Sequence, residues 1–422
     1  MSIVQTETTD NWPLTTLPGL YVHVPFCLRK CAYCDFYSIN DQSLILAWLT
    51  ALEKESGLYK DRFGVFDTLY LGGGTPSLLN TRQFASLLHI LRRPFSFAPD
   101  TEVSLEANPD DLTPEKLRVY KDLGVNRLSV GGQSFNDREL AFLGRRHNVR
   151  QTVAALEAAR AAGFGNLSLD LIFGLPGQSL ENWRHTLEQA LVFDPEHLSC
   201  YQLTYEPETP LGRRKARGEV IPATEEEERE FFLFTSRFLE ERGYRHYEIS
   251  NFARQEPGAE PCYSRHNRKY WNHTPYLGLG PGAHSFQEGV RWWNAPSVEQ
   301  YCQELAQGRK PVAGRETLAA AQLQMEALYL GLRTREGVSL DLLRQVPGWE
   351  KTLHNFKKAG LLEVHQDRVA PTLQGFLLAD SLPLRFLDEG LEEKDMGYQG
   401  ENTLASAPWP LAPDPWFPAP EP

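Results

Sequence analysis

Between residues 20 and 241 the sequence alternates six times between a short apolar segment and a longer segment with helical spacing. Parallel strands require helical crossovers, so six strand-then-helix units in series predict a parallel sheet. The expected strands are 20–24, 68–71, 102–107, 127–130, 167–173 and 197–203, and the expected helices are 43–58, 81–91, 113–123, 150–162, 180–192 and 225–241. Six units are fewer than the eight of a closed TIM barrel. We therefore predict an α/β fold built on an open, partial (β/α)6 TIM-type barrel.

The segments that flank this barrel, which we place at 20–250, differ from it in pattern. Residues 1–19 are expected to form an irregular arm, and 251–314 a connecting region with the motifs HNRKYW and LGLGPGAHS. Helical segments before the hairpin-like LLEVHQDRVAPT predict a small C-terminal domain over 315–388, helical and winged-helix-like. Residues 389–422 are expected to be a disordered tail, because seven prolines among its last sixteen residues prevent a packed core.

Composition narrows the class of protein and its partners. The net charge is −12, and only two adjacent lysines mark the winged-helix-like segment, so nucleic acid is not an expected partner. No apolar stretch is long enough for a membrane span, and the N-terminal residues lack the basic and apolar regions of a secretory leader. We therefore expect a cytoplasmic protein with no transmembrane segment, for which peripheral membrane contact stays open.

Three of the six cysteines fall within eight residues, directly after the first expected strand. Cys27, Cys31 and Cys34 have the spacing C-x3-C-x2-C in the segment YVHVPFCLRKCAYCDF. Three thiolates can hold a [4Fe-4S] cluster and leave one iron open to a small molecule. A structural zinc site is the alternative, but it would need a fourth Cys or His, and Phe36 occupies the obvious position. The spacing therefore predicts an iron-sulfur cluster.

Other polar residues follow the remaining expected strands. Because barrel sites form at the carboxyl ends of the strands, we expect these residues to line one cavity: Gly72–Thr75, Glu106, Gln133, Asp170 and Thr204. Glu106 and Asp170 can accept hydrogen bonds from ribose hydroxyls or face a cation, and Gln133 and Arg145 can donate to a carboxylate. Taken singly, the glycines could mark a tight turn and each acid a capped turn or surface ion pair.

Together these motifs resemble the radical S-adenosylmethionine (SAM) superfamily. YVHVPFC, LGGGTPS, SLEANPDDL, GGQSF, LDLIFGLPGQ, YEISNFA, HNRKYW and LGLGPGAHS resemble the oxygen-independent coproporphyrinogen III oxidase-like family, and within it the HemW-type haem chaperone branch, over about residues 20–385. The resemblance implies that the barrel is a radical SAM core and that SAM chelates the open iron. It also implies SAM contacts at the matching positions, which are Tyr21, Tyr33, Gly73, Gly74, Thr75, Glu106, Gln133, Arg145 and Asp170.

Three functions are compatible with this resemblance. A coproporphyrinogen III dehydrogenase has a fourth cysteine where this chain has Phe36, and a longer N-terminal segment, whereas no Lys or Arg precedes Tyr21 here. HNRKYW is similar to an element of the chaperone branch, and His266 could ligate haem iron while Tyr270 and Trp271 stack on the ring. A class C methyltransferase stays open as a third possibility.

The favoured expectation is a haem chaperone that binds a [4Fe-4S] cluster, SAM and haem. Its expected partners are a haem-accepting protein and an electron donor. Enzymatic SAM cleavage stays open, and we assign no catalytic residue. Arg268 and Lys269 are expected to hold haem propionates. The structural alternative is that His266 hydrogen-bonds a loop and the aromatic rings are core, and Cys262 is not expected to pair with His266 on a metal because PCYSRHN resembles a loop.

Overall fold

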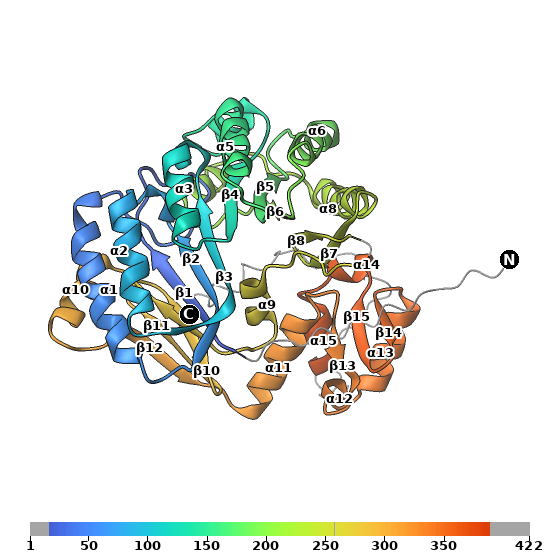
Figure 1. Ribbon diagram of the computed structural model, residues 1–422. Coiled ribbons are helices and arrows are strands. Elements are labelled where there is room, and N and C mark those ends of the chain that lie inside the picture. Colours follow the sequence, from blue (N-terminus) through green and yellow to red (C-terminus); the bar gives the residue numbers. More distant parts are fainter. Residues whose placement is uncertain (1–16, 257, 389–422) are drawn as a thin grey trace.

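The computed structural model describes residues 17–256 and 258–388. Its main feature is a 12-stranded sheet in the order β12-β11-β10-β9-β1-β2-β3-β4-β5-β6-β8-β7, which curves into an open barrel (Figure 1). Residues 1–16 of the expected arm and the whole expected tail, 389–422, lie outside the described residues. The last residue of the expected arm, Gly19, begins the first strand.

The six expected strand-then-helix units form the parallel centre of this sheet. Their elements are β1 (Gly19–Val24), α1 (Ile45–Tyr59), β2 (Val65–Gly73), α2 (Thr81–Arg92), β3 (Ser96–Ala107), α3 (Pro114–Asp122), β4 (Arg127–Gln133), α5 (Val149–Ala161), β5 (Leu167–Phe173), α6 (Leu180–Leu191), β6 (His197–Gln202) and α8 (Glu225–Glu240). The predicted fold class is confirmed. The prediction lacked two short helices, α4 (Asp137–Phe142) and α7 (Pro210–Ala216), and the 3-10 turns Gln42–Leu44, Pro76–Leu78 and Pro109–Asp111.

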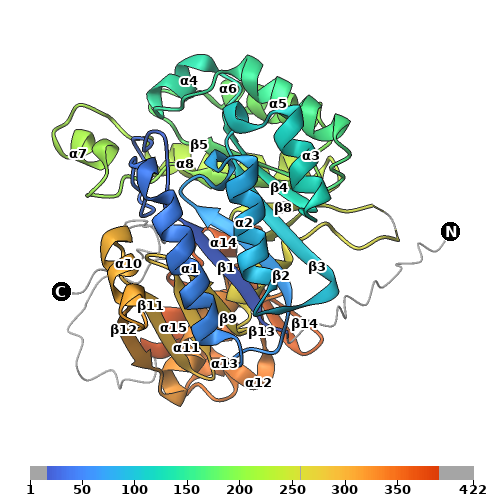
Figure 2. The ribbon, with the colours of Figure 1, turned by 60° about the vertical axis from the view of Figure 1, so that its left-hand side comes forward.

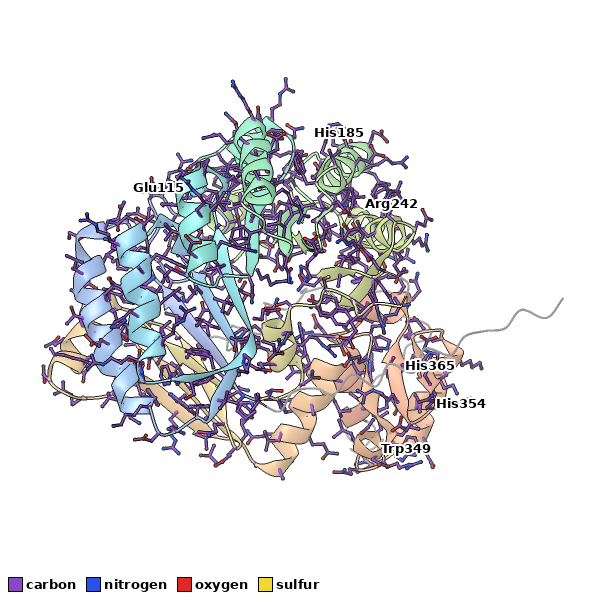
Figure 3. All side chains as sticks on the ribbon, in the orientation of Figure 1. Glu115, His185, Arg242, Trp349, His354 and His365 are labelled. Atoms are coloured by element: carbon purple, nitrogen blue, oxygen red, sulfur yellow. The ribbon has the colours of Figure 1, made fainter. Side chains whose placement is uncertain are left out.

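The helices cover the outside of the barrel with one apolar face each. Caps fix where several of them begin: at the start of α8 the Thr224 side chain accepts from the Glu227 N–H, and the Glu227 carboxylate accepts from the Thr224 N–H. The labelled polar side chains Glu115, His185 and Arg242 point outward from the barrel helices and the end of α8 (Figure 3). The inside of the barrel is therefore lined by strand residues and by the segments that enter it.

The connecting region extends both edges of the same sheet. β7 (Tyr244–Glu248) and β8 (Asn251–Arg254) pair antiparallel beyond β6. On the other edge β9 (Tyr276–Leu279) pairs parallel with β1, and β10 (His284–Gln287), β11 (Val290–Asn294) and β12 (Val312–Thr317) follow antiparallel. Helices α9 (Arg265–Trp271) and α10 (Val298–Ala306) lie between these strands in sequence. The expectation of a loop holds for 261–264 only, because Ser264 caps a helix that contains HNRKYW.

The C-terminal residues form a smaller unit with its own core, drawn in orange and red in Figure 1. It contains α11 (Ala320–Gly331), β13 (Val338–Ser339), α12 (Leu340–Leu343), α13 (Trp349–Lys358), β14 (Leu362–His365), β15 (Arg368–Pro371), α14 (Leu373–Phe376) and α15 (Leu382–Asp388). β14 and β15 form the expected hairpin, and β13 completes a three-stranded sheet. Two backbone hydrogen bonds, Ile249 N–H to Arg333 O and Arg335 N–H to Tyr247 O, join this unit to the β7–β8 hairpin.

Within the described ranges, every helix is too short or too polar to cross a membrane.

One buried carboxylate joins the first helix to the late strands. Glu55 on α1 is fully buried, and its carboxylate accepts from Asn294 Nδ2 at 2.6 Å, Gly280 N–H at 2.9 Å and Tyr301 Oη at 2.6 Å. Burial raises the pKa of Glu55 to about 7, against the lowering effect of these three donors. The contact between α1 and the late strands therefore depends on a carboxyl group that binds its proton more tightly in the folded than in the unfolded state.

This shift predicts a pH-dependent stability. Because folded Glu55 binds its proton more tightly than unfolded Glu55, its contribution to the free energy of unfolding should fall between pH 4.5 and about 7 and stay constant above. This loss in the free energy of unfolding is about 3 kcal/mol. Glu55→Gln removes the titration, so denaturant unfolding should show this variant gaining about that much relative to the unmodified chain over the same pH range. Glu53→Gln, on the exposed face of α1, is the matched control, and equal pH profiles for both variants would contradict the prediction.

Candidate functional site

The carboxyl ends of the parallel strands surround a cavity of about 400 Å³. All nine residues that the sequence analysis proposes as SAM contacts line it: Tyr21, Tyr33, Gly73, Gly74, Thr75, Glu106, Gln133, Arg145 and Asp170. Thr204, which follows β6, lines it as well. As expected for a site at the carboxyl ends of parallel strands, the cavity is lined by residues from all six of these strands, or from the segments that follow them, and from the loop before α5.

The cysteine loop between β1 and α1 forms one wall of this cavity. The Thr75 hydroxyl donates to Cys27 Sγ at 3.3 Å, and Arg145 Nη1 donates to Cys31 Sγ at 3.4 Å. Burial, followed by the proximity of Cys31 and Cys27, raises the pKa of Cys34 to about 12. Three sulfurs that repel one another's charge in a buried loop fit a cationic iron-sulfur group, whose binding would deprotonate them.

No group of three metal-binding side chains in the described ranges converges closely enough to hold a single ion. A cluster of four irons occupies more space than one ion, so three thiolates around it need not meet at one point. The donor set fits a [4Fe-4S] cluster better than a structural zinc ion, since a zinc site wants four ligands around one centre. Phe36 lines the cavity at the position where a fourth cysteine would be expected.

The glycine turn after β2 is shaped by its neighbours. Gly73 has a φ of 104°, and a side chain there would lie 2.5 Å from the His23 ring. A Cβ on Gly74 would lie 2.8 Å from the carbonyl oxygens of Val24 and Phe26. Glu106 holds the turn because it accepts from Gly73 N–H at 3.1 Å and from Tyr70 Oη at 2.8 Å. The glycines therefore allow the turn to pass close to β1, as well as exposing backbone to the cavity.

Arg145 connects the cysteine loop with the ends of β3 and β4. Its Nη2 donates to Gly131 O at 2.9 Å and to Asn108 Oδ1, while its Nε is buried and has no hydrogen-bond partner among residues 17–256 and 258–388. Gln133, at a register shift in β4, has a φ of 65°, which non-glycine residues rarely adopt. An unpaired buried donor and a strained backbone at the same cavity wall are typical of a ligand site.

Asp170 is the acid on the opposite wall, on β5. The Ser129 hydroxyl donates to its two oxygens at 3.0 and 3.2 Å, and burial raises its pKa to about 6. Ser199 donates to this carboxylate as well, and its remaining acceptor positions suit ligand hydroxyls or a cationic ligand. Cys200 on β6 also lines the cavity.

The HNRKYW helix enters the barrel, but its histidine does not face the cavity. His266 is fully buried, with Nδ1 2.7 Å from Thr68 Oγ1 and Nε2 2.7 Å from Tyr270 Oη. Its ring stacks on Tyr70 with 5.1 Å between centroids. Both ring nitrogens are hydrogen-bonded in this structure, so axial ligation by His266 stays a prediction that would require one of these hydrogen bonds to break.

The two basic residues of the motif, Arg268 and Lys269, form ion pairs within the protein and are not free to bind haem propionates in this structure. Lys269 Nζ lies 2.6 Å from Asp67 Oδ1, with both side chains buried, and Arg268 pairs with Glu336 of the C-terminal unit. The motif does contribute Asn267, Tyr270 and Trp271 to the cavity wall. Its aromatic residues thus lie where the cavity could hold a ligand ring, and stacking on haem stays a prediction, whereas its cations anchor the helix.

The sequence analysis missed the part of the cavity formed by the C-terminal unit. Arg333 and residues 376–381 line it, although they are remote in sequence from the strand ends. Tyr70, also missed, lies two residues after Thr68 on β2, so the period of two places both side chains on the same face of the strand. No local pattern marks the C-terminal contribution. Figure 3 shows Trp349, His354 and His365 on the outer side of the same unit, away from this cavity.

Comparisons with known proteins agree with this geometry. Residues 21–190 match the Radical SAM superfamily and residues 318–378 the HemN C-terminal domain. The heme chaperone HemW of Mycobacterium tuberculosis is 39% identical over 86% of this chain and 93% of its own. HemW of Bacillus subtilis is 37% identical over 88% of this chain and 100% of its own. The structure of coproporphyrinogen III oxidase (HemN) from Escherichia coli, a radical SAM enzyme, superposes with a TM-score of 0.75 at 26% identity, covering 88% of this chain and 90% of that one.

The cysteine loop generates one prediction. Cys31→Ala should prevent assembly of an iron-sulfur cluster, because two thiolates cannot hold four irons against chelation. After anaerobic reconstitution with iron and sulfide, the variant should lack the brown absorption and the bound iron of the unmodified chain. Cys302→Ala, on the distant helix α10, is the matched control and should reconstitute normally. Full iron content in the Cys31 variant would contradict the assignment.

The two acids in the cavity wall, Glu106 and Asp170, lead to a prediction about SAM binding. Glu106→Gln and Asp170→Asn should keep the cluster but weaken SAM binding, because a hydrogen bond to a charged group contributes about 1.5 to 3 kcal/mol, or about tenfold or more in affinity. Calorimetric titration with SAM measures the change. Glu115→Gln on the outside of α3 should bind like the unmodified chain (Figure 3). If both cavity variants kept the original affinity, SAM would not bind where we place it.

Proposed function

Because this chain belongs to the HemW family of radical SAM proteins, we propose that it is a haem chaperone that binds a [4Fe-4S] cluster, SAM and haem and passes the haem to an acceptor protein. The observation that carries the proposal is the match to relatives named heme chaperones over almost the whole of both chains. The cavity supports it by combining a cysteine loop, polar strand ends and an aromatic wall in one space.

The residues of this cavity divide the work. Cys27, Cys31 and Cys34 would hold the cluster, and the unpaired Nε of Arg145 would face a ligand carboxylate. Glu106 keeps the Gly73 turn in place beside the ligand. Bound together, a reduced [4Fe-4S] cluster and SAM supply one-electron chemistry, and the buried strand ends keep water away from it.

Haem would contact the aromatic wall. Tyr270 and Trp271 are each only 7% exposed and line the cavity, so a flat apolar ring could stack there with little cost in side-chain entropy. Both the barrel and the C-terminal unit line the cavity. Because residues 376–381 of the smaller unit form the wall beside the barrel, we propose that haem enters from that side.

Coproporphyrinogen III oxidation is the second candidate, supported by the fold of the Escherichia coli enzyme. It is disfavoured because Phe36 stands where that activity implies a fourth cysteine. Assaying the reconstituted protein on coproporphyrinogen III with SAM and a reductant separates the two. A haem chaperone should bind haemin and leave the porphyrinogen unchanged, whereas turnover without haemin binding would replace our proposal with the second candidate.

The proposed haem contact predicts the effect of one substitution. Trp271→Ala should weaken haemin binding about tenfold, because a buried aromatic ring contact contributes about 1.5 kcal/mol in addition to the apolar area it covers. Absorbance titration with haemin measures the affinity, and iron content checks that the cluster is intact. Trp349→Ala, on the outer side of the C-terminal unit, is the matched control and should bind haemin normally (Figure 3). Equal affinities for both variants would remove Trp271 from the haem site.

A further inference from the structure

The outer side of the cysteine loop is exposed to solvent. Leu28, Arg29 and Lys30 lie between two of the cluster cysteines, and Leu28 is 44% exposed, whereas Cys27 itself is only 8% exposed. The loop is fixed to the barrel because Arg29 donates to the carbonyl oxygens of Gly144 and Arg145 at 2.8 and 3.1 Å. An ordered surface therefore lies within a few bonds of the proposed cluster ligands.

Helix α7 extends this surface. The Leu211 N–H donates to Ala32 O at 2.8 Å, and Leu211 is buried in a small core that includes Ala32 and Tyr33 of the cysteine loop. Figure 2 shows α7 beside that loop at the edge of the barrel. With its apolar side chain turned inward, α7 leaves polar residues on its outer side. We call the joint surface the basic face, which consists of Arg29, Lys30, Arg213, Arg214, Lys215 and Arg217.

The charge of the basic face is opposite to that of the chain as a whole. The segments 28–30 and 210–217 contain six basic residues and no acid, although the chain has a net charge of −12. Nearby carboxylates compensate only in part: Glu219 is shared by Arg214 at 3.8 Å and Arg217 at 2.5 Å, Glu208 lies 3.3 Å from Arg213, and Glu228 interacts electrostatically with Lys215. These pairs are solvent-exposed, and such pairs contribute little energy and leave the local potential positive.

We infer that the basic face is the docking surface of a small acidic electron-transfer protein. The inference rests on the proposed function, because a cluster that works with SAM must be reduced from outside. One electron leaves the donor's flavin or iron-sulfur centre and reduces the cluster by one unit, with no proton or atom transferred. Electron transfer slows steeply with distance, so the donor must approach where the cysteine loop meets solvent. Opposite charges steer such transient encounters and raise their association rate.

An anionic membrane could also be attracted by this charge, but the surface lacks an apolar anchor of the required size. Membrane-bound helices insert a continuous apolar face, and the apolar Leu211 of α7 is buried in the protein. Leu28 and Ile221 are exposed singly, and single exposed apolar residues are ordinary on protein surfaces. The location beside the cluster loop thus favours the electron donor.

The test reverses charge on α7 and leaves the cysteine loop unchanged. Arg213→Glu combined with Lys215→Glu is compared with Lys357→Glu combined with Lys358→Glu on the exposed side of α13, which makes the same change in net charge. The probe is an acidic flavodoxin, reduced with light, mixed with the reconstituted protein in a stopped-flow instrument. We expect the α7 variant to be reduced at least tenfold more slowly at low ionic strength and the difference to disappear at high salt.

Two further measurements separate docking from the cluster and from haem. Oxidised flavodoxin titrated into cluster-free protein should bind more weakly to the α7 variant than to the α13 variant, which reports docking without any activity. Both variants should be reduced equally fast by dithionite and should bind haemin equally. A cluster that fails to form in the unmodified chain would defeat the proposed function. If the cluster forms but flavodoxin reduces both variants alike, or if only phosphatidylglycerol vesicles distinguish them, the docking inference is wrong.

Discussion

Parallel pairing of β1 to β6 is the constraint on which the site depends. It carries all six strands in the same direction, so the residues that leave each strand emerge at one rim, whatever their distance in sequence. Glu106 and Gly73 come from neighbouring strands and meet in a 3.1 Å hydrogen bond for that reason. The cysteine loop leaves this rim from β1, which is flanked on both sides by parallel neighbours, β2 and β9.

Buried charge pairs position the helix that fills part of the barrel interior. Asp67 on β2 is paired with both Lys269 and Arg265 of α9, and the Glu102 carboxylate accepts from the first N–H groups of that helix. Breaking such a pair leaves an uncompensated buried charge, which is strongly destabilising. The cations of HNRKYW are therefore committed to holding the helix, and Tyr270 and Trp271 reach the cavity because the helix cannot rotate.

Local patterns in the sequence predict the features of the structure that are set by neighbouring residues along the chain. The six strands, their helices and the acids at strand ends follow from periodicity and from the direction of parallel strands, so the amino-acid sequence alone places Glu106 and Asp170 at the rim. The partners of His266 do not follow from it, because Thr68 lies 198 residues away and becomes a neighbour only when α9 enters the barrel. The wall formed by residues 376–381 was missed for the same reason, since it depends on how a second core packs against the first.

That wall also couples the unfolding of the two cores. Arg333 and residues 376–381 belong to the C-terminal unit, while the facing wall belongs to the barrel, so a molecule in the cavity touches both. A ligand that binds only the folded state stabilises it in proportion to the logarithm of the ligand concentration. A ligand in this cavity would therefore stabilise the junction between the barrel and the C-terminal unit as well as each of the two. Besides hydrogen bonds and ion pairs, Phe376 and Leu377 already pack the smaller unit into the barrel core, so a bound molecule would add to a junction that apolar contacts begin.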